Sequence, residues 1–306
     1  MISQEARDLF AANVKAMTAG DAAHLASQLL PDDVSRLKDI AYVHDGDAAH
    51  LLDIYTLADA EEGAALPVIV DFHGGGLYYG NKENNECRDM LLARQGFAVV
   101  NANYRLVPSG SFPAQLADAM AVLDWIRDHG AEYGLDAERV CVTGDSAGGA
   151  LALYLCAANG STQLAGALGL WQSGIEVHAL VVTSGMFRLQ GGVHANALSY
   201  YMEGYLQTPA DHIKVNPYLD LDKLIVDGDV PPIYVITSVE DFIADNTYEL
   251  ARILHARHKD HAMSVWPKGR ERVLGHVFNI VQAGDPEAGE AHQVICDIAD
   301  YCKRYI

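Results

Sequence analysis

Three residues that lie far apart in the sequence have the types and the chain order that nucleophilic catalysis requires. Ser146 lies in GDSAG at 144–148, which fits the pattern G-x-S-x-G, and Asp241 and His276 follow it in that order. A serine hydroxyl is a weak nucleophile unless a base takes its proton, and the base needs an acid to hold its tautomer. A serine in this pattern is expected to be followed by its acid and then by its base. We therefore predict Ser146 as the nucleophile, Asp241 as the acid and His276 as the base.

The residues on either side of the serine predict how it is held. An apolar run at 139–143 precedes the motif, and an alanine-rich helical pattern at 147–158 follows it. A turn this sharp between a strand and a helix forces the serine into a strained backbone conformation, and the glycines beside it leave room. The hydroxyl is then expected at the positive N-terminal end of the helix. The pattern alone is common by chance, so the flanking strand and helix carry much of the prediction.

Other acidic residues near Asp241 compete for the role of the acid. Glu240 and Asp245 lie in the same segment, after an apolar run at 233–238. A carboxylate just past the end of a strand is best placed to reach a histidine, whereas Asp245 is expected to start the following helix as a cap. His276 is one of 13 histidines, and it is preferred because it follows the last predicted strand and a glycine.

A second chemical feature is the glycine run in DFHGGGLYYG at 71–80. Three consecutive glycines are costly to order, because glycine loses more backbone freedom on folding than any other residue. The bare backbone suits a phosphate cradle, a tight turn, or amide N–H groups that face a developing negative charge. The spacings G-x-x-x-x-G-K-[ST] and G-x-G-x-x-G, which are typical of phosphate binding, do not occur at this run.

His255, His258 and His261 invite a metal-binding interpretation. The carboxylate–histidine pattern of a zinc-binding helix does not accompany them, so they are predicted to form a solvated helix end. We predict neither a metal nor an organic cofactor, because acyl transfer through a serine needs neither.

Apolar runs alternate with helical patterns along the chain. Predicted strands lie at 39–43, 51–57, 67–72, 98–104, 139–143, 179–183, 233–238 and 263–267. Predicted helices lie at 3–30, 84–95, 112–129, 147–158, 246–258 and 287–304. Several of the strands are continuously apolar, as expected for strands covered on both faces. The alternation favours an α/β fold with a doubly wound, mostly parallel sheet, in one domain that spans 1–306.

One segment breaks this alternation. No strand is predicted between 186 and 216, and the segment contains aromatic residues and a methionine: Phe187, Tyr200, Tyr201, Met202 and Tyr205. A long connection between two strands is often a lid or a binding element. A surface helix packed by its aromatic residues is an equally good interpretation.

The composition excludes several classes of partner. Lys and Arg total 21 against 41 Asp and Glu, which gives a formal net charge of -20. Such a chain is repelled by nucleic-acid phosphates and by anionic membrane surfaces, and no apolar stretch approaches the length of a membrane span. The five cysteines form no CxxC pair, and the N-terminal residues lack the apolar core of a signal peptide. We therefore expect a soluble, cytoplasmic protein that binds neither nucleic acid nor membrane.

Together the motifs resemble a known family. The chain is similar to the hormone-sensitive-lipase-like (bacterial) branch of the α/β-hydrolase esterases in six ordered segments: HGGG at 73–76, NYRLVP at 103–108, FPAQLAD at 112–118, GDSAGG at 144–149, Glu240-Asp241 and His276. The resemblance implies an eight-stranded α/β-hydrolase sheet that carries a Ser–Asp–His triad. It also implies an oxyanion hole made by Gly75, Gly76 and Ala147. A helical cap from about 1–38 and 186–215 is expected, and members of the family are often homodimers.

The chain departs from this family at four positions. Phe242 and Ile243 stand where the family usually has proline and leucine after the acid. Val277 follows the base where a glycine is usual, and Ser109 replaces a common glutamate. None of these departures removes a predicted catalytic group.

The resemblance and the motifs together predict a serine carboxylic-ester hydrolase that acts on a small-molecule ester. Six residues are predicted to line its substrate pocket: Leu77, Tyr78, Tyr79, Met186, Phe187 and Tyr201. Bulky aromatic side chains near the nucleophile favour short acyl groups, from acetyl to about butyryl. Tyrosine hydroxyls also suit a sugar, so deacetylation of acylated carbohydrates is an alternative.

Two further classes of function are less favoured. A peptidase of the same sheet architecture generally carries a large extra domain, which this chain lacks. A non-catalytic ligand-binding protein on the same scaffold typically loses the base, whereas His276 is present here.

Overall fold

The computed structural model describes residues 2–60, 65–189 and 198–306. These residues form one eight-stranded sheet in the order β1-β2-β4-β3-β5-β6-β7-β8. The strands are β1 (Val34–Ala41), β2 (Leu51–Leu57), β3 (Leu66–Phe72), β4 (Ala98–Ala102), β5 (Leu135–Asp145), β6 (Val177–Thr183), β7 (Ile233–Ser238) and β8 (His261–Trp266). Only the pairs β1–β2 and β2–β4 are antiparallel among the described strands. The predicted doubly wound, mostly parallel eight-stranded sheet is therefore confirmed.

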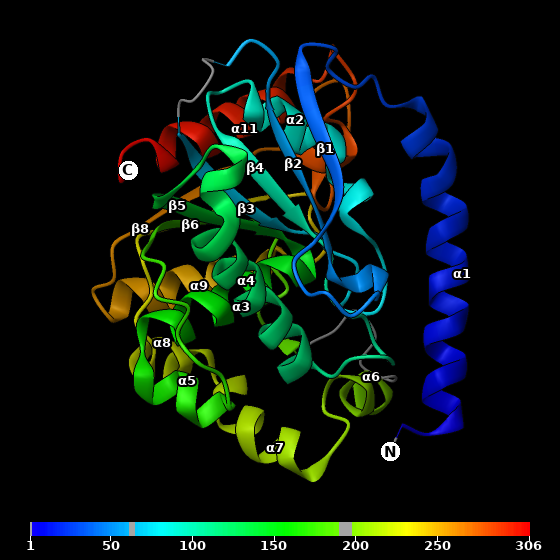
Figure 1. Cartoon of the computed structure of the whole chain (residues 1–306). Helices are drawn as coiled ribbons and strands as arrows, with labels where there is room; N and C mark the ends of the chain where they lie inside the picture. Colours follow the sequence, from blue (N-terminus) through cyan, green and yellow to red (C-terminus); the bar gives the residue numbers. More distant parts are fainter. Residues whose placement is uncertain (1, 61–64, 190–197) are drawn as a thin grey trace.

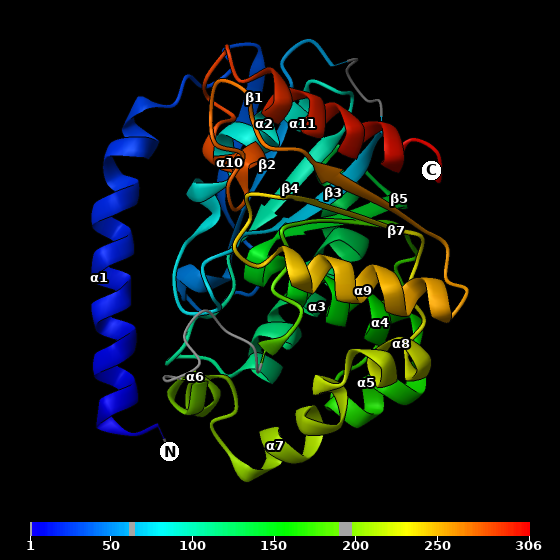
Figure 2. The same ribbon diagram turned by 180° about the vertical axis from the view of Figure 1, so that it is seen from behind.

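Helices cover both faces of the sheet, as Figures 1 and 2 show. They are α1 (Gln4–Ser27), α2 (Glu86–Ala93), α3 (Phe112–His129), α4 (Ser146–Gly160), α5 (Thr162–Leu168), α6 (Leu198–Tyr205), α7 (Pro209–Val215), α8 (Leu221–Asp227), α9 (Ala244–Ala256), α10 (Phe278–Val281) and α11 (Gly289–Cys302). The helices α2, α10 and α11 pack in one apolar core, and α3, α4, α8 and α9 pack in the other. Each central strand serves both cores, because successive side chains of a strand point to opposite faces. In β3, for example, Val68 and Val70 belong to one core and Ile69 to the other.

The element boundaries differ from the predicted ones where apolar patterning is weak. The strand predicted at 39–43 instead spans Val34–Ala41 in β1, whose middle residues are largely exposed. An edge strand has no neighbour on one side, so it need not be continuously apolar. The short helices α5, α7 and α8 were not among the predicted elements, because segments of seven residues give little periodicity.

The sequence predicted no strand between 186 and 216, and the structure describes part of this segment. Between β6 and β7 the chain forms α6, α7 and α8, and the described residues of this connection contain no strand. Residues 190–197 of the predicted cap segment 186–215 lie outside the described residues.

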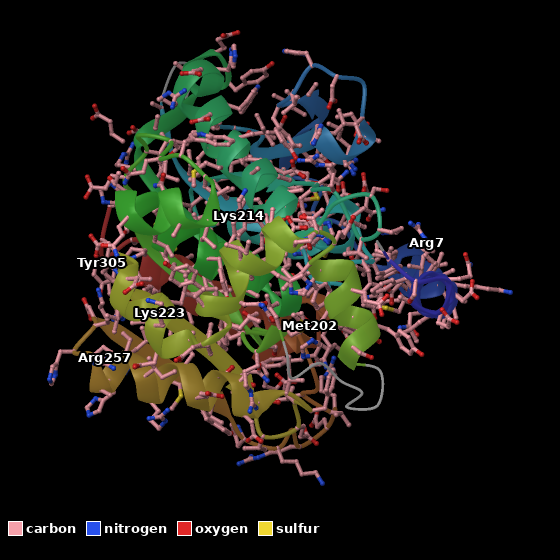
Figure 3. All side chains as sticks on the ribbon, turned by 90° about the horizontal axis from the view of Figure 1, so that it is seen from below. Arg7, Met202, Lys214, Lys223, Arg257 and Tyr305 are labelled. Carbon is pink, nitrogen blue, oxygen red and sulfur yellow. The ribbon has the colours of Figure 1, made fainter. Side chains whose placement is uncertain are left out.

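The helix α1 flanks the sheet, and the N-terminal end of α1 lies beside α6 (Figure 1). Figure 3 shows α1, which carries Arg7, beside α6, which carries Met202. The ring of Phe10 packs at 5.2 Å from the ring of Tyr78 and 5.7 Å from that of Tyr201. The amide of Asn13 donates a hydrogen bond to the Tyr201 hydroxyl at 2.9 Å. Packing of α1 thus joins the N-terminal segment to both α6 and the residues after the glycine run.

Candidate active site

The turn between β5 and α4 holds Ser146 in an unusual backbone conformation. The strand ends at Asp145, the helix begins at Ser146, and Ser146 has φ of 49°, in the left-handed region that non-glycine residues rarely adopt. A Cβ atom on Gly148 would lie 2.0 Å from the carbonyl oxygen of Phe72. Only glycine at 148 therefore lets the first turn of α4 lie directly against β3. The local sequence thus places the Ser146 hydroxyl at the carboxyl edge of the sheet.

The three residues predicted for catalysis lie in contact. The Nε2 atom of His276 is 2.9 Å from the hydroxyl oxygen of Ser146, and its Nδ1 atom is 2.9 Å from Oδ1 of Asp241. Asp241 also accepts hydrogen bonds from the Thr237 hydroxyl at 2.9 Å and from the backbone N–H of Ile243 at 3.1 Å. Both carboxylate oxygens are therefore held, and the imidazole is oriented toward Ser146.

Asp241 is ionised in this environment. Burial opposes its charge, but the hydrogen bond and charge of His276 and the N–H of Ile243 outweigh burial and hold the pKa of Asp241 below its ordinary value. The competing residues have other contacts. Glu240 accepts backbone hydrogen bonds from Gly269 and Leu274 at 3.0 and 2.9 Å, and so fixes the segment that leads to His276. Asp245 is exposed in the first turn of α9, whose N-cap is Ile243, so the prediction that Asp245 caps this helix is wrong.

The glycine run forms a tight turn beside Ser146. Gly75 and Gly76 have φ of 109° and 63°, and the backbone N–H groups of Tyr78 and Tyr79 donate to the carbonyl of Gly75. A Cβ atom on Gly75 would lie 2.0 Å from the Tyr79 carbonyl oxygen. Gly75 and Gly76 line the same cavity as Ser146, and Ala147 is buried in the first turn of α4, where helix N–H groups have no intrahelical acceptor.

His73 anchors the turn and is not placed to act as a base. Its ring stacks on Tyr104 at 4.6 Å, and the Tyr104 hydroxyl donates to its backbone carbonyl at 2.7 Å. Burial lowers the pKa of His73 to about 4, so its ring is neutral near neutral pH.

A buried polar network lies beneath the turn, and the sequence reasoning missed it. The side-chain amide of Asn85 donates to Asp71 at 2.7 Å and to Asp145 at 2.9 Å, while the Arg88 guanidinium lies 2.5 Å from Asp71. Burial, followed by the charge of Asp71, raises the pKa of Asp145 to about 6. The available signal was the group of polar residues in the helical pattern predicted at 84–95, which includes Asn85, Arg88 and Asp89. Such residues are equally common on an exposed helix face, so the pattern alone did not distinguish the two.

Ser146 and His276 open into a cavity of about 340 Å³, called here the catalytic cavity. Three of the six predicted pocket residues line it: Tyr78, Tyr79 and Met186. The prediction for Leu77, Phe187 and Tyr201 is corrected, because among the described residues these three are core side chains and do not line the cavity. Leu77 has φ of 66°, which turns its side chain into the core, and Tyr201 packs against Phe10.

Other residues that line the catalytic cavity were not predicted. The helix α1 contributes Met17, Asp21, His24 and Leu25. The segments on either side of the acid and base contribute Phe242, Ile243, Val277, Ile280 and Val281. The Phe242 ring packs at 4.6 Å from the ring of His276 and is 63% exposed. Apolar side chains thus surround the catalytic groups on the side of the base.

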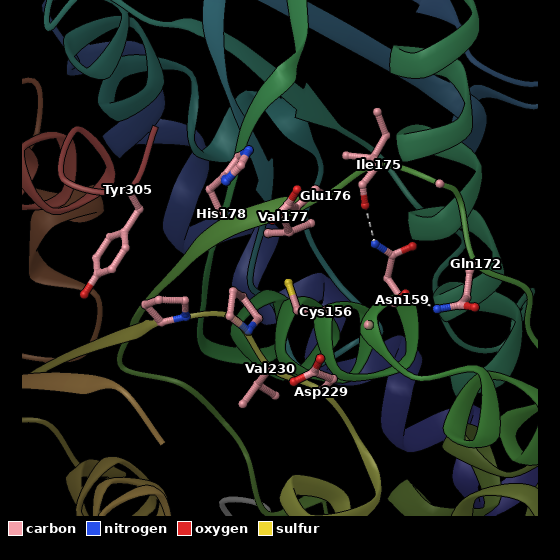
Figure 4. A pocket seen from close by; sticks show the side chains of 14 residues that line it. Cys156, Asn159, Gln172, Ile175, Glu176, Val177, His178, Asp229, Val230 and Tyr305 are labelled. Carbon is pink, nitrogen blue, oxygen red and sulfur yellow. Dashed lines mark hydrogen bonds between the residues drawn. The ribbon is translucent and has the colours of Figure 1, made fainter. Parts of the chain in front are cut away.

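A larger cavity of about 640 Å³ lies at the amino end of β6 (Figure 4). Ser146, in contrast, lies at the carboxyl end of β5. In the larger cavity the amide of Asn159 donates to the Ile175 carbonyl at 2.8 Å, close to Cys156, Glu176 and His178. Volume alone would favour this cavity as the active site. The chemistry favours the smaller one, because the nucleophile and base lie there.

Two findings concern other kinds of site. Within 2–60, 65–189 and 198–306, no group of three or more His, Cys, Asp or Glu residues is arranged to hold a metal ion. In the same ranges, each helix is too short or too polar to traverse a lipid bilayer.

Comparison with known proteins identifies the family. A family model described as alpha/beta hydrolase fold matches residues 69–272, more than half of the chain, and the chain belongs to this family. The probable carboxylic ester hydrolase LipM of Mycobacterium tuberculosis is 29% identical over 212 residues, which cover 65% of this chain and 48% of LipM. The chain therefore spans about half the length of that relative. The acetyl esterase of Salmonella schwarzengrund is 26% identical over 231 residues, covering 70% of this chain and 68% of that protein.

A solved structure matches the whole fold. The crystal structure of esterase B from Lactobacillus rhamnosis with a C4-C4 SN3 tributyrin phosphonate has a TM-score of 0.89 and 25% sequence identity. It covers 99% of this chain, and the match covers 97% of that chain. The resemblance to α/β-hydrolase esterases that the sequence motifs indicated is thereby confirmed.

Proposed function

We propose that this chain is a serine carboxylic-ester hydrolase. The observation that carries the proposal is the unbroken series of contacts from Ser146 through His276 to Asp241, with 2.9 Å between each pair of atoms. The hydroxyl of Ser146 also faces a cavity beside the glycine turn. The esterase relatives support the same class of reaction.

In the proposed mechanism, Ser146 attacks the ester carbonyl while His276 accepts its proton. The imidazolium that forms is stabilised by Asp241, and His276 then gives the proton to the leaving alcohol. The backbone N–H groups of Gly75, Gly76 and Ala147 stabilise the oxyanion of the tetrahedral intermediate. Each such donor typically contributes roughly 3 kcal/mol to transition-state stabilisation. Water then attacks the acyl-enzyme by the same sequence, so the chain's own residues carry every proton transfer.

We further propose that the substrates are small esters with short acyl groups. A volume of about 340 Å³ suits a small ligand, and much of the lining is apolar. The acetyl esterase and the tributyrin phosphonate among the relatives fit the same preference. The segments 1–38 and 186–215, which include α1, α6 and α7, are proposed as the cap, and α1 lines the catalytic cavity through Met17, Asp21, His24 and Leu25. A homodimer and a cytoplasmic location stay predictions from the sequence.

Acylated carbohydrates are the second candidate class. The observation that favours them is the group of polar side chains in the same cavity, where Asp21, Tyr79 and Asn84 lie together. A sugar hydroxyl can exchange hydrogen bonds with such groups.

A fluorophosphonate probe and an ester panel test the proposal. Wild type should be labelled, and Ser146→Ala should not be labelled and should lose activity. Absence of labelling in the wild type would favour a non-catalytic binding protein. The panel comprises nitrophenyl esters from acetate to decanoate and acetylated sugars. Faster hydrolysis of decanoate than of butyrate would contradict the short-acyl proposal, and a clear preference for acetylated sugars would establish the carbohydrate class.

A further inference from the structure

A second cavity adjoins the catalytic cavity. It has a volume of about 370 Å³ and is called here the side cavity. Six residues line both cavities: Asp21, Leu25, Tyr78, Tyr79, Gly80 and Asn84. Val14, Thr18 and Ala22 of α1, with Leu106, line only the side cavity. Because the two cavities share so much of their lining, only a thin wall of side chains separates them.

A hydrogen bond crosses this wall. The Tyr79 hydroxyl donates to Oδ2 of Asp21 at 2.8 Å, and the Asn84 amide lies 3.5 Å from the same oxygen. Burial, and then Asp21 itself, raises the pKa of Tyr79 to about 12, so the hydroxyl keeps its proton and stays a donor. The Asp21–Tyr79 contact therefore links α1 directly to the end of the glycine turn.

The half of α1 that carries Asp21 is lightly held. The buried residues of α1 are Ala6 and Phe10, both in its first half. Asp21 itself is half-buried. A hydrogen bond at this place therefore has more influence on the position of α1 than it would have in a packed core.

The position of the base decides which end of an ester points to the side cavity. The leaving alcohol must lie within reach of His276, because His276 protonates it. Phe242, Ile243, Val277, Ile280 and Val281 line the catalytic cavity near that base, and none of these described residues lines the side cavity. The acyl chain, which stays on Ser146, is therefore directed along the glycine turn toward Tyr79.

We propose that the side cavity is an extension of the acyl site that the Asp21–Tyr79 hydrogen bond closes. The inference rests on the proposed esterase function and adds to it the residues that set acyl-chain length. With the bond formed, the chain ends at Tyr79 and short acyl groups are preferred. With the bond removed, an apolar chain passes between α1 and the turn and contacts Val14 and Leu106.

Chain-length profiles of three variants test the proposal. Tyr79→Phe removes one hydroxyl, and Asp21→Ala removes its acceptor. Each should raise the ratio of kcat/KM for decanoate to that for butyrate about fivefold to tenfold, the range expected when one hydrogen bond no longer holds the closed form. Asp21→Asn keeps an oxygen that can accept the Tyr79 hydrogen bond and is the matched control. It should change the decanoate-to-butyrate ratio clearly less than Asp21→Ala does. The double variant Tyr79→Phe/Asp21→Ala should change the ratio no more than either single variant does, because the two substitutions remove the same hydrogen bond.

Filling the side cavity gives an independent check. Val14→Trp places a large ring in a position that lines only the side cavity, so in the Tyr79→Phe background it should return the ratio toward the wild-type value. If the decanoate-to-butyrate ratio of Tyr79→Phe stays raised when Val14→Trp is added, the proposal is overturned. An unchanged ratio in both Tyr79→Phe and Asp21→Ala also overturns it. These results would leave the proposed function standing as long as fluorophosphonate labels the wild type. Loss of labelling in the wild type would instead remove the proposed function and the inference with it.

Discussion

The backbone N–H of Gly74 donates a hydrogen bond to the Asp145 carboxylate at 3.0 Å, which joins the glycine turn to the residue before Ser146. The same carboxylate oxygen accepts from Asn85 at 2.9 Å. A Cβ atom on Gly74 would lie 2.4 Å from the Asp145 side chain, so the close approach depends on glycine. The nucleophile and the proposed oxyanion donors therefore share one buried support. Their relative position is fixed by Asp145 and Asn85, which also lie in the lining of the catalytic cavity.

This support makes stability depend on pH in a defined direction. The pKa of Asp145 rises from its ordinary value of 3.8 to about 6, chiefly through burial, so the folded state holds this proton more tightly than the unfolded state does. The contribution of Asp145 to stability therefore falls as pH rises from about 4 to 6, and the penalty is complete above 6. Asp145→Asn removes the penalty. The free energy of unfolding of Asp145→Asn, relative to that of wild type, should therefore increase as pH rises through this window, by up to roughly 3 kcal/mol.

Urea unfolding of both proteins at pH 4, 5, 6 and 7 measures this difference. A difference that stays constant over the four pH values would show that Asp145 does not titrate in this range.

The acid of the proposed triad has a matched control in its own segment. Asp241→Asn should lower kcat roughly 10⁴-fold with little change in KM, because an amide cannot hold the imidazole in the required tautomer. Asp245→Asn, four residues on and exposed, should keep nearly full activity. Steady-state kinetics with a butyrate ester compares the two. Equal losses in both variants would count against Asp241 as the acid.

Val277 follows the proposed base in a backbone conformation that suits glycine. Its φ is 47°, and this left-handed conformation costs a non-glycine residue roughly 1–2 kcal/mol. Val277→Gly relieves that strain but raises the entropy of the unfolded chain, at a cost of about 0.4–1 kcal/mol. We expect a free energy of unfolding between the wild-type value and about 1.6 kcal/mol above it.

Val281→Gly is the control for this substitution. Val281 ends the short helix α10 without a positive φ, so glycine there relieves no strain and should lower stability by about 0.4–1 kcal/mol through the entropy of the unfolded chain. Urea unfolding at neutral pH is the measurement. If Val277→Gly lowers the free energy of unfolding as much as Val281→Gly does, the backbone at Val277 is not strained.

The glycine turn is expected to contribute to kcat rather than to substrate binding. Gly75→Ala would place a methyl group 2.0 Å from the Tyr79 carbonyl at a backbone φ of 109°, so the turn must shift. Loss of alignment of one oxyanion donor typically lowers kcat about 10²–10³-fold. Gly20→Ala, where a Cβ meets nothing within 4 Å, is the control and should leave activity unchanged. An unaltered kcat in Gly75→Ala would remove the turn from the proposed mechanism.

The parts of the fold that were predictable are those with a strong local pattern. The strands at 51–57 and 233–238 and the helix at 112–129 coincide with β2, β7 and α3. The helix α3 is long, β7 is nearly all apolar, and β2 is apolar apart from Asp53 and Thr56, so the burial of their own side chains largely decides their conformation. The edge strand β1 and the seven-residue helices depend on the elements that pack beside them, and their sequences carry little period of their own.

By itself the sequence determined which residues meet at the carboxyl edge of the sheet. A G-x-S-x-G turn after an apolar strand, with Asp241 and His276 beyond later strands, leaves few other arrangements, because parallel strands bring their carboxyl ends together. Only the tertiary structure decided what surrounds them. It buried Leu77, turned by its positive φ, and brought α1 with Asp21 against Tyr79. These outcomes depend on side-chain directions and on the packing of distant elements, neither of which a local pattern encodes.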